Sequence, residues 1–129
     1  MGSNLKKKIM VVDDEPDVAF TVEYNLNKAD NSYDISHVNN GKQCIELLEN
    51  KQIPDLILLD IMMPEMSGWE VYKKLKENPD WKKIPVVFLT ARNDLVAKKA
   101  GSFLGDDYIE KPYDPTDLKK RIDKLLDGK

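Results

Sequence analysis

The strongest constraint on the fold is a regular alternation of short apolar runs with segments of helical periodicity. Runs of four apolar residues occur at residues 9–12, 56–59 and 86–89. Unbroken runs of this kind are typical of strands covered on both faces, as the inner strands of a parallel sheet are. Residues 33–38 alternate less regularly and predict an edge strand, and residues 108–109 fall where a fifth strand would follow. The chain is therefore expected to contain five strands.

The segments between the strands repeat apolar residues at helical spacing. The last is the clearest, because Leu118, Ile122 and Leu125 lie at positions i, i+4 and i+7. Asp114 suits the N-cap of this helix and Pro115 its first position. Similar stripes follow Pro16 and run through residues 44–48 and 71–75. Strand and helix in alternation predict a single α/β domain with a parallel sheet and right-handed crossovers.

Length and composition limit the classes of function. The 129 residues suit one domain, expected over residues 7–127, with residues 1–6 disordered or left over from expression. Twenty basic and 23 acidic residues give a net charge of −3, which disfavours direct binding of nucleic acid. No apolar run approaches the roughly 20 residues of a membrane span, and no signal peptide is expected before the first strand.

The single cysteine and the single histidine restrict the metal chemistry. Cys44 cannot form an intramolecular disulfide, and neither it nor His37 has the companions that a thiolate or histidine zinc site needs. His37 is expected to be a surface residue of the second strand. A reducing, cytoplasmic location is expected.

Residues capable of chemistry follow the apolar runs directly. Asp13 and Asp14 follow the first predicted strand, Asp60 the third, Thr90 the fourth, and Lys111 the short fifth strand. In an open parallel sheet, binding sites form beyond the carboxyl ends of the strands. Three carboxylates gathered there repel one another unless a cation neutralises them, and a hard divalent ion such as Mg²⁺ prefers oxygen ligands. Any one acid is more often a helix cap or the start of a turn, but the whole set predicts a metal-dependent site.

The set suits phosphoryl transfer to a carboxylate. Asp60 stands alone at the end of the central strand and is the candidate nucleophile, whereas Asp13 and Asp14 are paired to hold the ion. Phosphoryl transfer depends mainly on positioning and charge neutralisation, which a cation and the Lys111 ammonium group would supply. The Thr90 hydroxyl would donate a hydrogen bond to the phosphoryl group.

Four motifs in order resemble those of the receiver domains of bacterial and archaeal response regulators. They are Val11-Val12-Asp13-Asp14-Glu15-Pro16, Leu59-Asp60-Ile61-Met62-Met63-Pro64 with Gly68, Leu89-Thr90-Ala91, and Asp107-Tyr108-Ile109-Glu110-Lys111-Pro112. The likeness covers nearly the whole chain. It implies a flavodoxin-like, doubly wound sheet of five strands in the order 2-1-3-4-5, flanked by five helices.

The resemblance also implies how the ion and the phosphoryl group are bound. Asp60 would be the phosphoacceptor, and Mg²⁺ or Mn²⁺ would be held by Asp13, Asp14, Asp60 and the main-chain carbonyl of Met62. Lys111 would contact the phosphoryl group. The peptide bond that follows it, to proline, is usually cis in the family.

A switch and one departure from the family pattern complete the comparison. Thr90 and Tyr108 match the switch pair, in which the hydroxyl moves towards the phosphoryl group and the aromatic ring turns inward. The small Ala91 would leave the site open to a donor or to water. Residues 93–100 predict a fourth helix shorter than is common in the family, and Phe103 in the loop that follows is expected to be a core residue.

The implied function is signalling rather than turnover of a substrate. The domain would take a phosphoryl group from a histidine kinase or histidine phosphotransfer protein, and release it slowly by autodephosphorylation. While phosphorylated, it would act on a downstream effector, with a phosphorylation-dependent homodimer as one form of output. Neither nucleic acid nor a membrane is an expected partner of this domain.

Three alternatives are open at this point. A phosphohydrolase of the haloacid dehalogenase type would carry a second aspartate two residues after the nucleophile, where this chain has Met62. A flavin mononucleotide-binding domain would need a phosphate-accepting loop after the first strand, where Asp13, Asp14 and Glu15 would repel the ligand. A degenerate receiver is disfavoured because all five site residues are present.

Overall fold

Five parallel strands form one sheet in the order β2-β1-β3-β4-β5, as the family resemblance implied. The computed structural model describes residues 6–28, 32–91, 107–111 and 113–127, without the side chains of Thr90 and Ala91. The strands are Lys7–Val12 (β1), Tyr33–Val38 (β2), Leu56–Leu59 (β3), Val86–Ala91 (β4) and Asp107–Lys111 (β5). The helices among the described residues are Pro16–Asn27 (α1), Gly41–Glu49 (α2), Gly68–Glu77 (α3) and Pro115–Asp127 (α5). The predicted helix at 93–100 and the predicted core residue Phe103 lie outside these residues.

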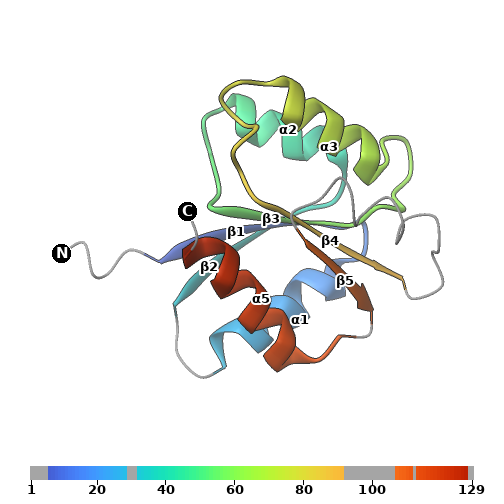
Figure 1. Ribbon diagram of the computed structural model, residues 1–129. Helices are drawn as coiled ribbons and strands as arrows, with labels where there is room; N and C mark the ends of the chain where they lie inside the picture. The colour runs from blue at the N-terminus through green and yellow to red at the C-terminus, as the bar shows by residue number, and fades with distance from the viewer. Residues whose placement is uncertain (1–5, 29–31, 92–106, 112, 128–129) are drawn as a thin grey trace.

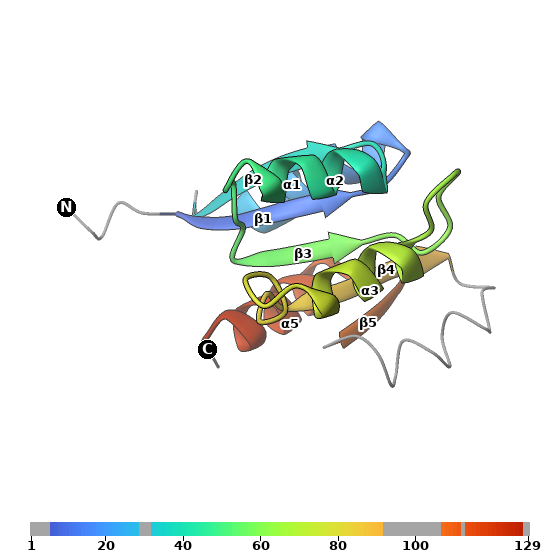
Figure 2. The same ribbon diagram turned by 90° about the horizontal axis from the view of Figure 1, so that it is seen from above.

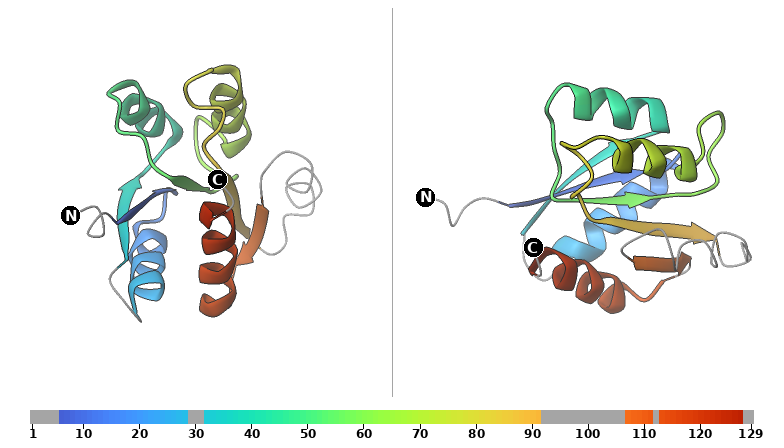
Figure 3. Two further views of the ribbon diagram at one scale, coloured as in Figure 1. Left: turned by 60° about the vertical axis from the view of Figure 1, so that its left-hand side comes forward. Right: turned by 45° about the horizontal axis from the view of Figure 1, so that its top comes forward.

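The helices cover both faces of the sheet. Helices α2 and α3 lie on one face and α1 and α5 on the other, as Figures 1 and 3 show. The apolar runs of β1, β3 and β4 are continuous because their side chains point alternately into two apolar layers, and residues 9–12, 56–59 and 86–89 are all buried. No helix of the described part of the chain is long and apolar enough to cross a bilayer.

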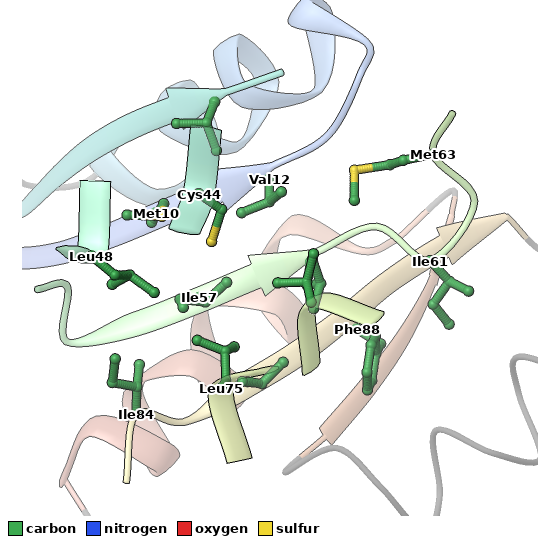
Figure 4. Packing of buried hydrophobic residues seen from close by; sticks show 14 residues of the cluster. Met10, Val12, Cys44, Leu48, Ile57, Ile61, Met63, Leu75, Ile84 and Phe88 are labelled. Atoms are coloured by element: carbon green, nitrogen blue, oxygen red, sulfur yellow. The ribbon is translucent and has the colours of Figure 1, made fainter. Parts of the chain in front are cut away.

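Each face of the sheet has its own core. The upper cluster, beneath α2 and α3, includes Met10, Val12, Cys44, Leu59, Leu75 and Phe88 (Figure 4). The lower cluster, against α1 and α5, includes Ile9, Val11, Val22, Leu58, Leu89 and Ile122. Since burying one such side chain contributes roughly 1.5–3 kcal/mol, these two layers supply the main driving force for folding.

Local signals set the helix ends. The Ser67 hydroxyl and the Glu70 carboxylate form a reciprocal capping box at the start of α3. The Asp114 carboxylate accepts the Thr116 N–H at 3.0 Å, which confirms the predicted cap of α5. Helix α1 begins at Pro16, whose missing N–H costs nothing at the first helical position.

The register of the sheet places the carboxyl ends of its strands at one edge. Val12 of β1 lies opposite Leu59 of β3, and Ala91 of β4 opposite Lys111 of β5. This edge lies on the right in Figure 1, and the view from above in Figure 2 shows the strands side by side. Asp13 and Asp60, which follow β1 and β3, are therefore brought to the same edge as Lys111, the last residue of β5.

Candidate functional site

Main-chain pairing carries two acids past the ends of their strands and holds them side by side. The Asp60 N–H donates to the carbonyl of Val12 at 2.9 Å, and the Asp13 N–H donates to the carbonyl of Val38 at 3.2 Å. Each bond extends the parallel ladder by one residue. Asp13 and Asp60 are thus neighbours at the edge of the sheet.

Asp13 is buried and fully engaged. Its side chain is 1% exposed. One carboxylate oxygen accepts the Glu15 N–H at 2.8 Å, and the other accepts the Lys111 ammonium group at 3.0 Å. These two bonds compensate the cost of burying the charge, which would be several kcal/mol for an isolated carboxylate.

Asp60 is buried as well, at 6% exposed. Its pKa is raised from 3.8 to about 6, first by burial and then by the negative charge of Asp13, with a smaller contribution from Asp14. Lys111 and a 3.4 Å contact from the Met62 N–H act in the opposite direction. The carboxylate therefore lies in a site that disfavours its charge and in which a further cation would be stabilised.

Lys111 reaches the acids from β5. Burial lowers its pKa, but the hydrogen bond and charge of Asp13, together with the charge of Asp60, outweigh that effect and raise it. Its side chain is 23% exposed. The lysine is therefore charged, bound to Asp13 and partly accessible to solvent.

The donor set fits a hard divalent cation. Carboxylate oxygens of Asp13, Asp14 and Glu15 lie within 4.8 Å of one another, and Asp14 and Glu15 are exposed. Asp60 is close enough to both aspartates for their charges to raise its pKa. Oxygen ligands of this kind, open to solvent on one side, are those that Mg²⁺ prefers.

Of the remaining predicted residues, the structure describes Tyr108 and Met62. Tyr108 is half-buried beside its register partner Phe88, and its ring packs against the upper cluster. Met62 follows Asp60 on the β3–α3 loop, and its side chain is 67% exposed. The side chain of Thr90 and the residue Pro112, with its predicted cis bond, lie outside the described residues.

Two residues near the site make structural contacts that the sequence did not predict. His37 is on β2 as predicted, but it is half-buried, and its Nε2 lies 2.9 Å from the main-chain carbonyl of Asp13. Gly68 packs so closely on the Asp60 loop that a Cβ atom there would lie 2.3 Å from the Asp60 carbonyl oxygen. The glycine was visible as part of a motif, whereas nothing in the sequence pairs His37 with Asp13.

Comparison with known proteins gives a consistent family. The sequence profile of the response regulator receiver domain matches residues 9–123. The alkaline phosphatase synthesis transcriptional regulatory protein PhoP of Bacillus subtilis strain 168 is 36% identical over 95% of this chain and 49% of its own length. A probable cyclic di-GMP phosphodiesterase of Vibrio cholerae is 40% identical over 94% of this chain and 27% of its own length. The chain thus spans about half or less of the length of these curated relatives.

Solved structures agree with the sequence comparison. A response regulator from Chloroflexus aurantiacus superposes with a TM-score of 0.86 at 29% identity, covering 95% of this chain and 99% of the other. The signal receiver domain of a histidine kinase from Syntrophus aciditrophicus gives a TM-score of 0.83 at 34% identity, covering 95% and 91%. Because the family profile spans all but the ends of the chain and the fold agrees over the same length, the chain belongs to the response regulator receiver domain family.

Proposed function

We propose that residues 7–127 form a phosphoacceptor domain. Asp60 receives a phosphoryl group from a histidine of a donor protein, and the domain transmits its phosphorylation state to a partner. The observation that supports this most directly is the grouping of a buried Asp60 with Asp13 and Lys111, the last two joined at 3.0 Å. In this proposal the three residues would supply a nucleophile, a counter-charge for the phosphoryl oxygens and part of an acidic ligand set.

The transfer uses the residues as follows. A carboxylate oxygen of Asp60 attacks the phosphorus of a donor phosphohistidine. The P–N bond breaks, its electron pair returns to the donor imidazole, and an acyl phosphate forms on Asp60. The Lys111 ammonium group transfers its hydrogen bond from the Asp13 carboxylate to a phosphoryl oxygen, so its charge stays paired throughout.

Receiver domains bind Mg²⁺ in the active site, and the acids of this chain suit that ion. Asp13, Asp14, Asp60 and the main-chain carbonyl of Met62 are the proposed ligands. When bound, Mg²⁺ supplies positive charge next to the phosphoryl oxygens.

Signal output is proposed to depend on Thr90 and Tyr108. The new phosphoryl group accepts a hydrogen bond from the Thr90 hydroxyl, and the Tyr108 ring moves further inward. Tyr108 packs against the upper cluster, so a movement of its ring would change the packing of that layer. Phosphorylation then shifts the balance between two existing conformations rather than creating a new one.

The donor protein is proposed to dock over α1. This helix begins directly after the acidic cluster and turns Phe20 and Tyr24, 72% and 62% exposed, to solvent on the face opposite its buried residues. A cavity of about 400 Å³ lies between α1 and the start of α5, and Val18, Lys111 and Tyr113 are among its lining residues. Exposed aromatic residues on a helix that begins at the site are typical of a protein contact.

The chemistry is tested with a small phosphodonor. The chain is incubated with acetyl phosphate and Mg²⁺, and its intact mass is measured in parallel with that of Asp60→Asn. We expect one phosphoryl adduct on the native chain, none on Asp60→Asn, and none on either protein when the cation is chelated. An unmodified native chain, or an adduct that survives in Asp60→Asn, would reject the assignment.

The docking surface is tested by comparing protein and small-molecule donors. The double variant Phe20→Ser with Tyr24→Ser removes the aromatic face without touching either core cluster. We expect phosphorylation by a phosphorylated histidine kinase to slow by about thirtyfold, since interface aromatics often contribute more than 1 kcal/mol each, while acetyl phosphate reacts at the native rate. Equal slowing with both donors would place the defect in the site and not in docking.

A further inference from the structure

We propose that His37 is a positioning residue for the divalent cation. Its hydrogen bond to the Asp13 carbonyl fixes the peptide between Asp13 and Asp14 and so presents the Asp14 carboxylate to the ion. The inference rests on the proposed function, because it concerns the cation on which that function depends.

The geometry of the contact defines the role of the imidazole. His37 lies on the edge strand β2 in register with Val11, and its Nε2 is 2.9 Å from the Asp13 carbonyl oxygen. A carbonyl can only accept, so Nε2 carries the hydrogen and donates it. Both the neutral Nε2–H tautomer and the imidazolium satisfy this requirement. The contact therefore depends on the position of one N–H and not on the charge of the ring.

Strand β2 holds Asp13 through two of its polar groups. The main-chain carbonyl of Val38 accepts the Asp13 N–H, and the His37 ring donates to the Asp13 carbonyl. The two carboxylate oxygens accept from Glu15 and Lys111. The N–H, the carbonyl and both carboxylate oxygens of Asp13 are thus hydrogen-bonded, and the residue is 1% exposed. Asp13 is therefore held firmly in place, and Asp14 follows directly after it.

Asp14 is the member of the acidic cluster that most needs this support. It is exposed, and its carboxylate lies within 4.8 Å of those of Asp13 and Glu15. Repulsion between like charges favours a rotation of Asp14 towards solvent when the cation is absent. The Asp13 carbonyl and the Asp14 nitrogen belong to one planar peptide, so a hydrogen bond to that carbonyl restricts where the Asp14 side chain can go. Groups that orient metal ligands in this way commonly change affinity by an order of magnitude.

Three substitutions separate the hydrogen bond from the bulk of the ring. The amide nitrogen of His37→Gln reaches about as far as Nε2 and can donate to the carbonyl. His37→Asn is equally polar but one bond shorter, and His37→Leu keeps apolar volume without a donor. Ser36→Ala, an exposed change on the same strand, is the matched control.

The measurement is Mg²⁺ affinity by isothermal titration calorimetry at one pH, with urea unfolding of the cation-free proteins in parallel. We expect His37→Leu and His37→Asn to bind Mg²⁺ about tenfold more weakly than the native chain. His37→Gln and Ser36→Ala should stay within about twofold of it, as expected when the donor is kept or never involved. If the leucine variant unfolds, the comparison of Gln with Asn decides the question.

Two results would overturn the proposal. Native affinity in His37→Asn would show that the hydrogen bond does not position the ligands, and equal weakening in Gln and Asn would show that only the ring shape matters. The native titration is measured first, so a native chain that binds no Mg²⁺ would reject the proposed function together with this inference. A native chain that binds Mg²⁺ while the variants do not differ from it would reject the inference alone.

Discussion

The Lys111 ammonium group lies 3.0 Å from a carboxylate oxygen of Asp13, so two groups with different tasks are joined before any ligand arrives. The lysine is the proposed contact of the phosphoryl group, and the aspartate is a proposed ligand of the cation. A cation that binds Asp13 weakens its hold on Lys111, which frees the ammonium group for the phosphoryl oxygens. Cation binding and phosphorylation are thereby expected to favour each other.

Lys111→Ala should retain Mg²⁺ binding and phosphorylation of Asp60 but lose the conformational response. Removing the ammonium group leaves buried Asp13 without its partner, at an expected cost of about 2 kcal/mol in the free energy of unfolding. Amide spectra before and after phosphorylation should show changes near Tyr108 in the native chain that are missing in the variant. Lys120→Ala, at an exposed position of α5, is the control and should behave as native. Identical responses in Lys111→Ala and the native chain would disprove the assigned role.

Asp60→Asn should stabilise the cation-free protein at neutral pH. The pKa of Asp60 is raised to about 6 in the folded chain from an ordinary value of 3.8, so the folded state binds more protons between these values. Native stability therefore falls as pH rises from about 4 to about 6 and stays lower above that range, by up to roughly 3 kcal/mol. The variant lacks this loss, so its advantage should be full above pH 6 and absent below about pH 4. Urea unfolding from pH 4 to 8 without divalent cations tests this, and an advantage that does not vary with pH would contradict it.

Gly68→Ala should destabilise the fold and slow the chemistry together. A Cβ at this position would lie 2.3 Å from the Asp60 carbonyl oxygen and 2.8 Å from the Cα of Ile61, and neither main-chain atom can move independently. We expect a loss of about 3 kcal/mol and a displaced Asp60 loop. Gly41→Ala is the comparison, because its Cβ would meet side-chain atoms of Val71 and Met66 that can rearrange. Thermal unfolding should place Gly68→Ala well below Gly41→Ala, and the reverse order would refute this explanation.

Asp14→Asn and Asp13→Asn should separate cation binding from stability. Asp14 is exposed, so its neutralisation should weaken Mg²⁺ binding at least about tenfold with little change in unfolding. Asp13 is buried against Lys111, so its neutralisation should weaken binding and also cost about 1–3 kcal/mol. Calorimetric titration and urea unfolding of both variants measure the two effects. Equal stability losses would contradict the difference in burial.

The fold could be predicted because its signals are local and repeated. Continuous apolar runs at 9–12, 56–59 and 86–89 require cover on both faces, and the structure has helices on both. Asp114 predicted the start of α5, and its carboxylate accepts the Thr116 N–H as an N-cap. The order of the strands came from the family resemblance, because periodicity alone does not say which strands are neighbours.

The site could be predicted only as a set of residues that follow strands. That rule placed Asp13, Asp60 and Lys111 at one edge, where register and main-chain bonds bring them together. It could not anticipate the bond from His37 to the Asp13 carbonyl, since a side chain on an edge strand has no periodic signature for such a contact. The third carboxylate of the cluster, Glu15, was likewise missed because its inclusion depends on how the loop before Pro16 turns.

Phe20 and Tyr24 belong to neither core cluster, although they lie on the helix that begins at the reactive edge. We expect mutations at these two positions to accumulate without loss of folding or of the proposed acyl phosphate chemistry. A duplicated gene could therefore acquire a new upstream kinase through changes at the surface of α1, and two copies in one cell could avoid cross-talk by the same means.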